Sequence, residues 1–122
     1  MTTSNHVNIG TIIELHNVGR CTRQARDEYK LTTHSVTVLV GCYLLYKFIN
    51  KTFSYTKIRT FVSYYNDYRL KKHLSLLVDN KFINLSGDRY TMTSKGIDLI
   101  NSIADKQNSL TYEFCNKYNI EL

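Results

Sequence analysis

The 122-residue sequence contains no proline. Proline interrupts helices and presets the geometry of rigid turns. Its absence, beside ten tyrosines, predicts a helix-rich chain with few rigid turns. Hydrophobic residues make up 43% of the chain and aromatic residues 12%, which favours a folded globule over disorder. At this length we expect one domain, residues 1–122, with its own core.

Cysteine is sparse, and histidine forms no cluster. Cys21, Cys42 and Cys115 are odd in number, far apart and without a Cys-x-x-Cys pair. This pattern argues against both a disulfide framework and a zinc site. We expect reduced, mostly buried cysteines, as in an intracellular protein, and no bound metal. The histidines have no metal-ligand spacing: His6, His16, His34 and His73.

Long apolar runs are missing too. None reaches the roughly 18 residues needed to span a bilayer. The best candidate, residues 36–49, is too short and contains Lys47, so we expect a core helix there. The first ten residues, MTTSNHVNIG, lack the charged and apolar regions of a signal peptide. These features predict a cytoplasmic protein without membrane association.

The patterns of common enzyme sites are also absent. The chain has no nucleophile elbow, phosphate loop or paired-carboxylate motif. Gly10 and Gly19 do not belong to a nucleotide-binding fingerprint. We therefore expect a protein that is not an enzyme and that uses no cofactor.

Positive charge is what the chain has in excess. Sixteen Lys and Arg against ten Asp and Glu give a formal charge of +6 and a pI near 9.3. This balance favours a polyanionic partner, either nucleic acid or an acidic membrane surface. Arg20, Arg23 and Arg26 form a basic ridge, which is either part of such a surface or a solvated face balanced by Asp27 and Glu28.

Apolar spacing predicts three helices in the first half of the chain. After a frayed segment at 1–7, residues 8–30 form the first helix, weakened in its middle by Gly19. A threonine at 32–33 caps the second, which ends near Ile49 and is central to the core. A turn at 50–52 and a short buried strand or staple at Phe53 lead to a third helix, capped by Ser54. The inner positions of these helices are Ile9, Ile12, Ile13, Val18, Cys21 and Ala25; Val36, Leu39, Val40, Tyr43 and Ile49; and Ile58, Phe61, Val62 and Tyr65.

The next stretch, NDYRLKKHLSLLVDNKFI at 66–83, predicts an amphipathic helix that runs into a strand. Asn66 is a good N-cap, and Asn80 is the residue best able to adopt a left-handed C-cap. The inner stripe is Leu70, Leu74, Leu77 and Val78, with His73 at its margin. The opposite face is basic.

A small hairpin and two further helices complete the predicted fold. Residues 82–85 and 89–93 are β-patterned around Gly87, which supplies the positive φ of a tight turn. Thr93 or Ser94 caps the next helix, which carries Ile97, Ile100, Ile103 and Ala104. A last short helix covers 110–118, with Leu110, Phe114 and Tyr118. The fold class is therefore mainly α with a small β-hairpin.

The order of these elements and three motifs resemble the winged helix-turn-helix superfamily, MarR-like with a short wing. The passage LVDNKFI at 77–83 resembles the family's Leu-x-x-x-Gly-x-Ile run, although Lys81 stands where glycine is usual. The passage YTMTSKG at 90–96 resembles its Tyr-x-Leu-Thr-x-x-Gly exit from the wing, and Leu31-Thr32 resembles the opening of its second helix. The resemblance implies a winged-helix core at 31–96, with additional terminal helices at 8–30 and 97–118.

The resemblance further implies sequence-specific binding of double-stranded DNA, and hence a nucleoid-associated transcriptional regulator. The recognition helix would be 66–80 and the wing 82–93. Arg69 could read guanine through two hydrogen bonds, and Asp67 is either structural or a cytosine reader. The expected DNA-binding residues are Tyr68, Arg69, Lys71, Lys72, Ser75, Lys57 and Arg89.

Two other functions use the same fold. A winged helix can serve as a protein-interaction or assembly module, because a fold does not determine function. A replication or excision accessory factor of a phage or mobile element would bind DNA through the same residues.

As in MarR-type relatives, we expect a homodimer through the terminal helices, whose surplus apolar residues are Ile9, Ile12, Ile13, Leu110, Phe114 and Ile120.

Overall fold

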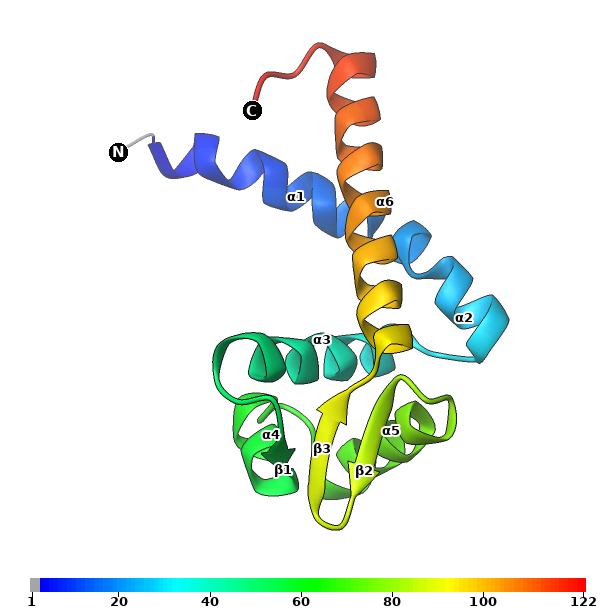
Figure 1. Ribbon diagram of the computed structural model, residues 1–122. Helices are drawn as coiled ribbons and strands as arrows, with labels where there is room; N and C mark the ends of the chain where they lie inside the picture. The colour runs from blue at the N-terminus through cyan, green and yellow to red at the C-terminus, as the bar shows by residue number, and fades with distance from the viewer. Residues whose placement is uncertain (1–2) are drawn as a thin grey trace.

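The computed structural model describes residues 3–122, with side chains from residue 8 onward. Over these residues the chain is mainly helical, with one small antiparallel sheet. Figure 1 shows α3 lying across the molecule, between the α1 and α6 pair on one side and α4, α5 and the sheet on the other. The elements are α1 (Thr3–Cys21), α2 (Arg23–Tyr29), α3 (Thr33–Phe48), β1 (Phe53–Ser54), α4 (Tyr55–Phe61), α5 (Asp67–Asp79), β2 (Ile83–Ser86), β3 (Arg89–Met92) and α6 (Ser94–Tyr118).

The first predicted helix, 8–30, is wrong as a single element. It is divided at Thr22, whose buried hydroxyl donates to the carbonyl oxygen of Val18 at 3.0 Å. Such a bond from a threonine side chain back to its own helix competes with the helical pattern and bends the chain. Gly19, where the helix seemed weakest, lies inside α1. The helix also begins earlier than expected, at Thr3, while residues 1 and 2 lie outside the described part.

α3 is the centre of the core. Thr32 caps it as predicted, by accepting a hydrogen bond from the Ser35 backbone N–H at 3.1 Å. Val36 and Leu39 are buried, but Ile49 is 59% exposed because the helix ends at Phe48. Buried residues from every layer below α3 meet it in one cluster: Phe53, Ile58, Val62, Leu70, Leu74, Leu77, Phe82, Ile83 and Met92.

The sheet has three strands in the order β1-β3-β2, one more than a hairpin alone. Phe53, expected to be a short strand or a staple, pairs with Tyr90 of β3 and is buried. β2 and β3 pair through to Ser86 opposite Arg89, so the turn has two residues. Gly87 has φ +62° as predicted. A positive φ at the first turn residue only is the type II′ pattern.

Two further helix caps, those of α4 and α5, agree with prediction, but the C-cap of α5 does not. Ser54 caps α4 and Asn66 caps α5, each accepting a backbone N–H through its side chain. At the end of α5, however, Asn80 has φ −86°, and the left-handed residue is Lys81 at φ 64°. Phe61, expected to face inward, is 45% exposed because α4 ends there.

The two helices expected after the hairpin are one. α6 runs for 25 residues from its cap at Thr93. Its inner stripe continues across the supposed break, because Gln107 lies in it at helical spacing between Ile103 and Leu110. The Gln107 side chain donates to the carbonyl oxygen of Glu14 and accepts from the Cys21 thiol, so it binds α6 to the end of α1.

Candidate functional site

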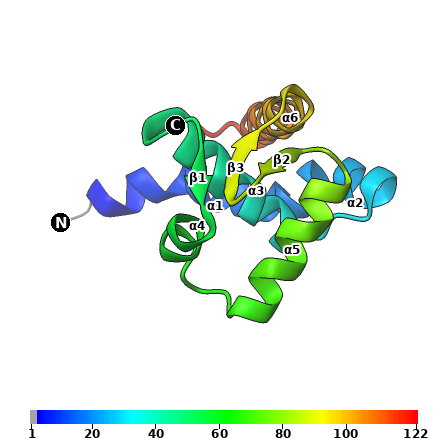
Figure 2. The ribbon, with the colours of Figure 1, turned by 60° about the horizontal axis from the view of Figure 1, so that its bottom comes forward.

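The exposed face of α5 carries five of the seven expected DNA-binding residues. Leu70, Leu74 and Leu77 are fully buried and define the inner side of the helix. At about 100° per residue, the side chains opposite them are Tyr68, Lys72 and Ser75. All three are exposed, Tyr68 by 76%. Figure 2 shows α5 protruding from the body on the side away from α6.

Arg69 and Lys71 lie on the two flanks of this face. Lys71 leans toward α4, where its ammonium lies 5.3 Å from the centroid of the Tyr55 ring. Arg69 lies on the opposite flank, among Thr33, Tyr65 and other residues beside the start of α3. Asp79, in the last turn, is exposed on the same side, so the helix offers four outward side chains between two lateral cations.

Asp67 is engaged within the protein. It accepts a hydrogen bond from the Tyr55 hydroxyl at 2.6 Å and pairs with Arg59 at 2.6 Å. Partial burial and the hydrogen bond to Asp67 raise the pKa of Tyr55 to about 12. The same hydrogen bond, followed by the charge of Arg59, lowers the pKa of Asp67. Of its two expected roles, this geometry favours the structural one: Asp67 fastens the start of α5 to α4.

Lys57 and Arg89, the remaining expected residues, do not join the α5 face directly. Lys57 is exposed on α4. The Arg89 guanidinium donates to the carbonyl oxygen of Thr52 at 2.7 Å and to its hydroxyl at 3.0 and 3.2 Å. Arg89 thus fixes the start of β3, beside the hairpin turn, to the loop before β1. Sequence reasoning missed Arg59, since its partner Asp67 lies in another helix.

A groove of about 720 Å³ lies between the start of α3 and α5, and sequence reasoning missed it as well. Lys30, Arg69 and Lys72 line it together with two histidines. His34 Nδ1 lies 2.9 Å from the Tyr65 hydroxyl, and His73 Nδ1 lies 3.0 Å from the Ser35 hydroxyl. The two imidazole centroids are 6.4 Å apart. The only sequence signal for this groove was His73 at the margin of the apolar stripe.

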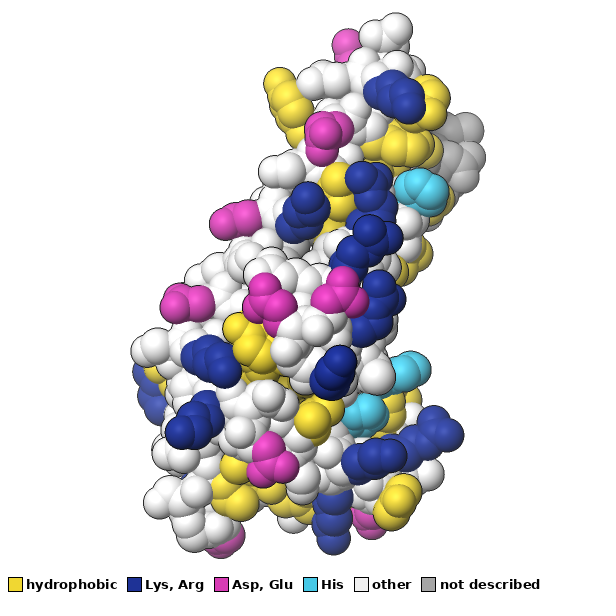
Figure 3. Space-filling view, turned by 90° about the vertical axis from the view of Figure 1, so that its right-hand side faces the viewer, with side chains coloured by type: hydrophobic (Ala, Val, Ile, Leu, Met, Phe, Trp, Pro, Cys, Tyr) yellow, Lys and Arg dark blue, Asp and Glu magenta, His cyan; other side chains and the backbone are white. Residues whose placement is uncertain are grey.

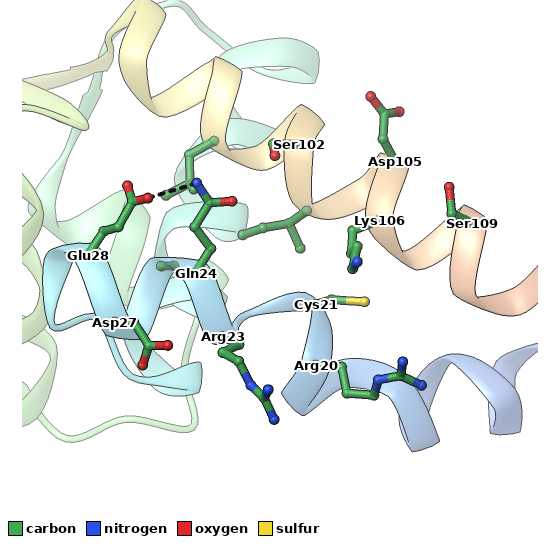
Figure 4. A pocket seen from close by; sticks show the side chains of 13 residues that line it. Arg20, Cys21, Arg23, Gln24, Asp27, Glu28, Ser102, Asp105, Lys106 and Ser109 are labelled. Carbon is green, nitrogen blue, oxygen red and sulfur yellow. Dashed lines mark hydrogen bonds between the residues drawn. The ribbon is translucent and has the colours of Figure 1, made fainter.

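A second groove, of about 680 Å³, lies where α1 and α2 meet α6 (Figure 4). It contains part of the predicted arginine ridge, but its charges balance: Arg20, Arg23 and Lys106 against Asp27, Glu28 and Asp105. Arg26 of the ridge pairs with Asp27 at 3.6 Å. Cys21 and Lys106 face each other in Figure 4, and burial raises the pKa of the Cys21 thiol. This groove has neither an excess of positive charge nor an activated thiol.

Many basic side chains of one face of the molecule are aligned, although others lie at its left-hand edge (Figure 3). Figure 3 shows Lys and Arg in a band down the right-hand part of the face it presents, with histidines beside the band. Most acidic side chains on that face lie to its left. Such a band is the electrostatic footprint of a polyanion-binding surface.

Two further features are absent from residues 3–122. No three His, Cys, Asp or Glu side chains of the described part are grouped in a way that could hold a metal ion. No helix there is long and apolar enough to cross a membrane. The three cysteines are free, with Cys21 and Cys42 buried and Cys115 half-buried.

No protein-family model, curated protein or solved structure matches the chain. The resemblance to MarR-type proteins therefore stays a prediction carried by the sequence motifs and the order of the elements.

Proposed function

We propose that this protein binds double-stranded DNA through α5, as a winged helix formed by residues 31–96. The single observation that carries the proposal is the outer face of α5, where Tyr68, Arg69, Lys71, Lys72 and Ser75 are all exposed. The acidic residues of α5 lie at its two ends: Asp67 is already paired with Arg59, and Asp79 is in the last turn.

The element order supports the winged-helix assignment. α3, β1, α4, α5, β2 and β3 follow one another, and β1 pairs with β3 beside the hairpin. An α-helix such as α5 is about 10–12 Å across with its side chains, and the major groove of B-DNA is about 12 Å wide. α5 therefore fits the groove, with the β2–β3 hairpin as the short wing.

The rotation of α5 about its axis suggests which of its side chains contact bases and which contact phosphates. Tyr68, Lys72 and Ser75 point straight outward and are placed to meet base edges, where lysine can bond guanine. Arg69 and Lys71, on the flanks, are placed to pair with the phosphates of the two strands. This assignment differs from the expectation that Arg69 reads a guanine.

We further propose that α1 and α6 form a homodimer. Ile13 and Leu110 of the expected interface are buried within the subunit itself, but Ile9 and Ile12 remain exposed. Additional large apolar side chains are exposed on the same two helices: Leu15, Val18, Tyr112 and Tyr118. A two-fold dimer would present two α5 helices to successive half-sites. Because its partner is DNA, the protein would work in the cytoplasm, in association with the nucleoid.

Binding of a labelled duplex, measured by fluorescence anisotropy over a range of salt concentrations, tests the DNA proposal. Affinity should fall steeply with salt, because each neutralised phosphate releases counterions. Lys72→Ala should weaken binding and reduce the slope of log K against log salt by about 1 if Lys72 meets a phosphate. If it reads bases instead, the loss should depend on DNA sequence. Lys106→Ala, on α6, is the matched control and should change neither quantity.

Undetectable binding at low salt would favour the alternative, in which the winged helix is a protein-interaction or assembly module. Equal losses in Lys72→Ala and Lys106→Ala would contradict the assignment of α5 as the DNA-contacting element. A phage or mobile-element accessory role shares the DNA site and would differ only in the sequences bound.

A further inference from the structure

The groove between the start of α3 and α5 has an unbalanced charge. Lys30, Arg69 and Lys72 line it, and Asp79 is its one acidic lining residue. None of the three cations forms an ion pair with any residue in the described part of the chain. The groove at α6, in contrast, holds equal numbers of acidic and basic side chains. The α3–α5 groove is thus a concave surface with surplus positive charge next to the outer face of α5.

Its two histidines are held in defined orientations. His34 and His73 are each hydrogen-bonded through Nδ1, to the hydroxyls of Tyr65 and Ser35. Nε2 of each ring has no hydrogen-bond partner within the described residues. A protonated imidazole donates from both nitrogens. Each ring can therefore keep its internal bond and donate from Nε2 to an acceptor in the groove.

We propose that this groove is a phosphate-binding site, in which His73 takes up a proton as the phosphate binds. The occupant we infer is a phosphodiester of the DNA backbone, since the groove shares with the α5 face Arg69, the residue placed to pair with a phosphate; this part rests on the proposed function. An inorganic phosphate ion has the same chemistry and is the simplest probe. The consequence is that DNA affinity depends on pH.

The direction of this dependence follows from the groups that face His73. They are His34 from α3; Lys30 from the segment before α3; Tyr65; and Tyr68, Arg69, Lys72 and Asp79 from α5. Burial, followed by His34 and the charges of Lys72 and Arg69, lowers the pKa of His73. An anion opposes this effect, because a nearby negative charge favours the protonated ring. The bound state therefore holds more protons, and affinity rises as pH falls through the interval between the free and bound pKa values.

The first experiment follows the histidine ring signals by NMR during pH titrations of the full chain. Three samples are compared: the protein alone, with inorganic phosphate and with duplex DNA. We expect the pKa of His73 to rise with DNA, and the ring signals of His16, on α1, to be unaffected by DNA. A rise with phosphate alone would identify the groove as a site for free phosphate ions. If DNA binds and neither ring responds to either anion, the groove proposal is wrong while the proposed function stands. If phosphate shifts the signals of both rings and DNA does not bind, the groove binds phosphate but the proposed function is wrong.

The second experiment measures DNA affinity between pH 8 and 6. Linkage allows up to about a tenfold gain per pH unit for each proton taken up. His73→Asn keeps a polar atom near the Ser35 hydroxyl but cannot titrate, so it should flatten this dependence. His16→Asn, the matched control, should retain the wild-type slope. Circular dichroism at each pH verifies that the variants are folded. Equal slopes in His73→Asn and wild type would overturn the assignment of His73.

Discussion

Lys81 shows how a single residue can depart from a motif while keeping its geometry. The Lys81 N–H bonds to the carbonyl oxygen of Val78 at 2.9 Å, and the Phe82 N–H bonds to that of Leu77 at 3.0 Å. These two bonds form a Schellman motif, whose left-handed residue is usually glycine. The motif that suggested a winged helix has glycine at this position, so the chain retains the backbone turn and tolerates the strain of a Cβ there.

Lys81→Gly should therefore stabilise the fold by about 1 kcal/mol, because glycine adopts positive φ without steric cost. Urea unfolding measures the change. Asn80→Gly is the contrasting variant: Asn80 has an ordinary φ and donates from its side chain to the carbonyl oxygen of Leu76 at 2.9 Å, so this change should destabilise. The opposite order of stabilities would place the left-handed residue at Asn80.

Asp67 illustrates a different residue-scale effect. From the sequence alone, an acidic residue at the start of a basic helix had two readings, as a structural group or as a base reader. The ion pair with Arg59 and the hydrogen bond from Tyr55 favour the structural role. They also explain how a carboxylate is tolerated beside a proposed phosphate-binding face.

Among the elements, the start of α6 depends on a close backbone approach. A Cβ at Gly96 would overlap the carbonyl oxygen of Phe82, which also accepts a hydrogen bond from Thr93. Glycine is needed here because there is no room for a side chain, and the backbone of the hairpin cannot move away independently. This accounts for the glycine that ends the YTMTSKG motif.

Gly96→Ala should destabilise the protein by about 1–3 kcal/mol through overpacking. Gly19→Ala is the matched substitution, since a Cβ at Gly19 meets nothing within 4 Å. It should stabilise α1 by up to about 1 kcal/mol, the difference in helix propensity. Thermal or urea unfolding of both variants compares them, and a neutral Gly96→Ala would contradict the described packing of α6 on Phe82.

The packing of α1 on α6 contains a buried amide. Asn17 is 1% exposed, and its Nδ2 has no hydrogen-bond partner among the residues that the structure describes. Asn17→Leu should raise the free energy of unfolding by about 1 kcal/mol, because a buried unsatisfied donor is costly and leucine has a similar shape. Asn108→Leu, at an exposed position of α6, should change stability little. A loss of stability in Asn17→Leu would imply that a water molecule satisfies the amide.

At the scale of the whole molecule, α1 and α6 cross above the α3 layer (Figure 1). Both helices carry exposed apolar side chains. Leu15 on α1 is 68% exposed, and Tyr112 on α6 is 70% exposed. Isolated apolar residues are common on surfaces, but several along two neighbouring helices are typical of an interface.

We expect a dimer by light scattering at micromolar concentrations, and a monomer for Leu15→Glu, which would place a charge in the interface. Leu85→Glu is the control. Leu85 is also exposed and apolar, but it lies on the hairpin, so this variant should remain dimeric. A monomer mass for the wild type over the whole concentration range would refute the proposed dimer.

The sequence by itself determined the local structure of this protein. Most helix positions, the caps at Thr32, Ser54 and Asn66, and the turn at Gly87 were all predicted, because each depends on residues within a few positions of one another. The grouping of basic side chains on α5 was also predictable, since helical periodicity alone places them on one face.

Tertiary structure decided the features that depend on contacts distant in sequence. Gln107 links the middle of α6 to α1 through a hydrogen bond to Glu14, 93 residues away. β1 becomes a strand only because β3 lies beside it. Arg89 turns toward Thr52, and His34 and His73 meet across 39 positions in one groove. A side chain's partner determines its charge state and orientation, so these roles appear only when packing brings distant residues within bonding distance.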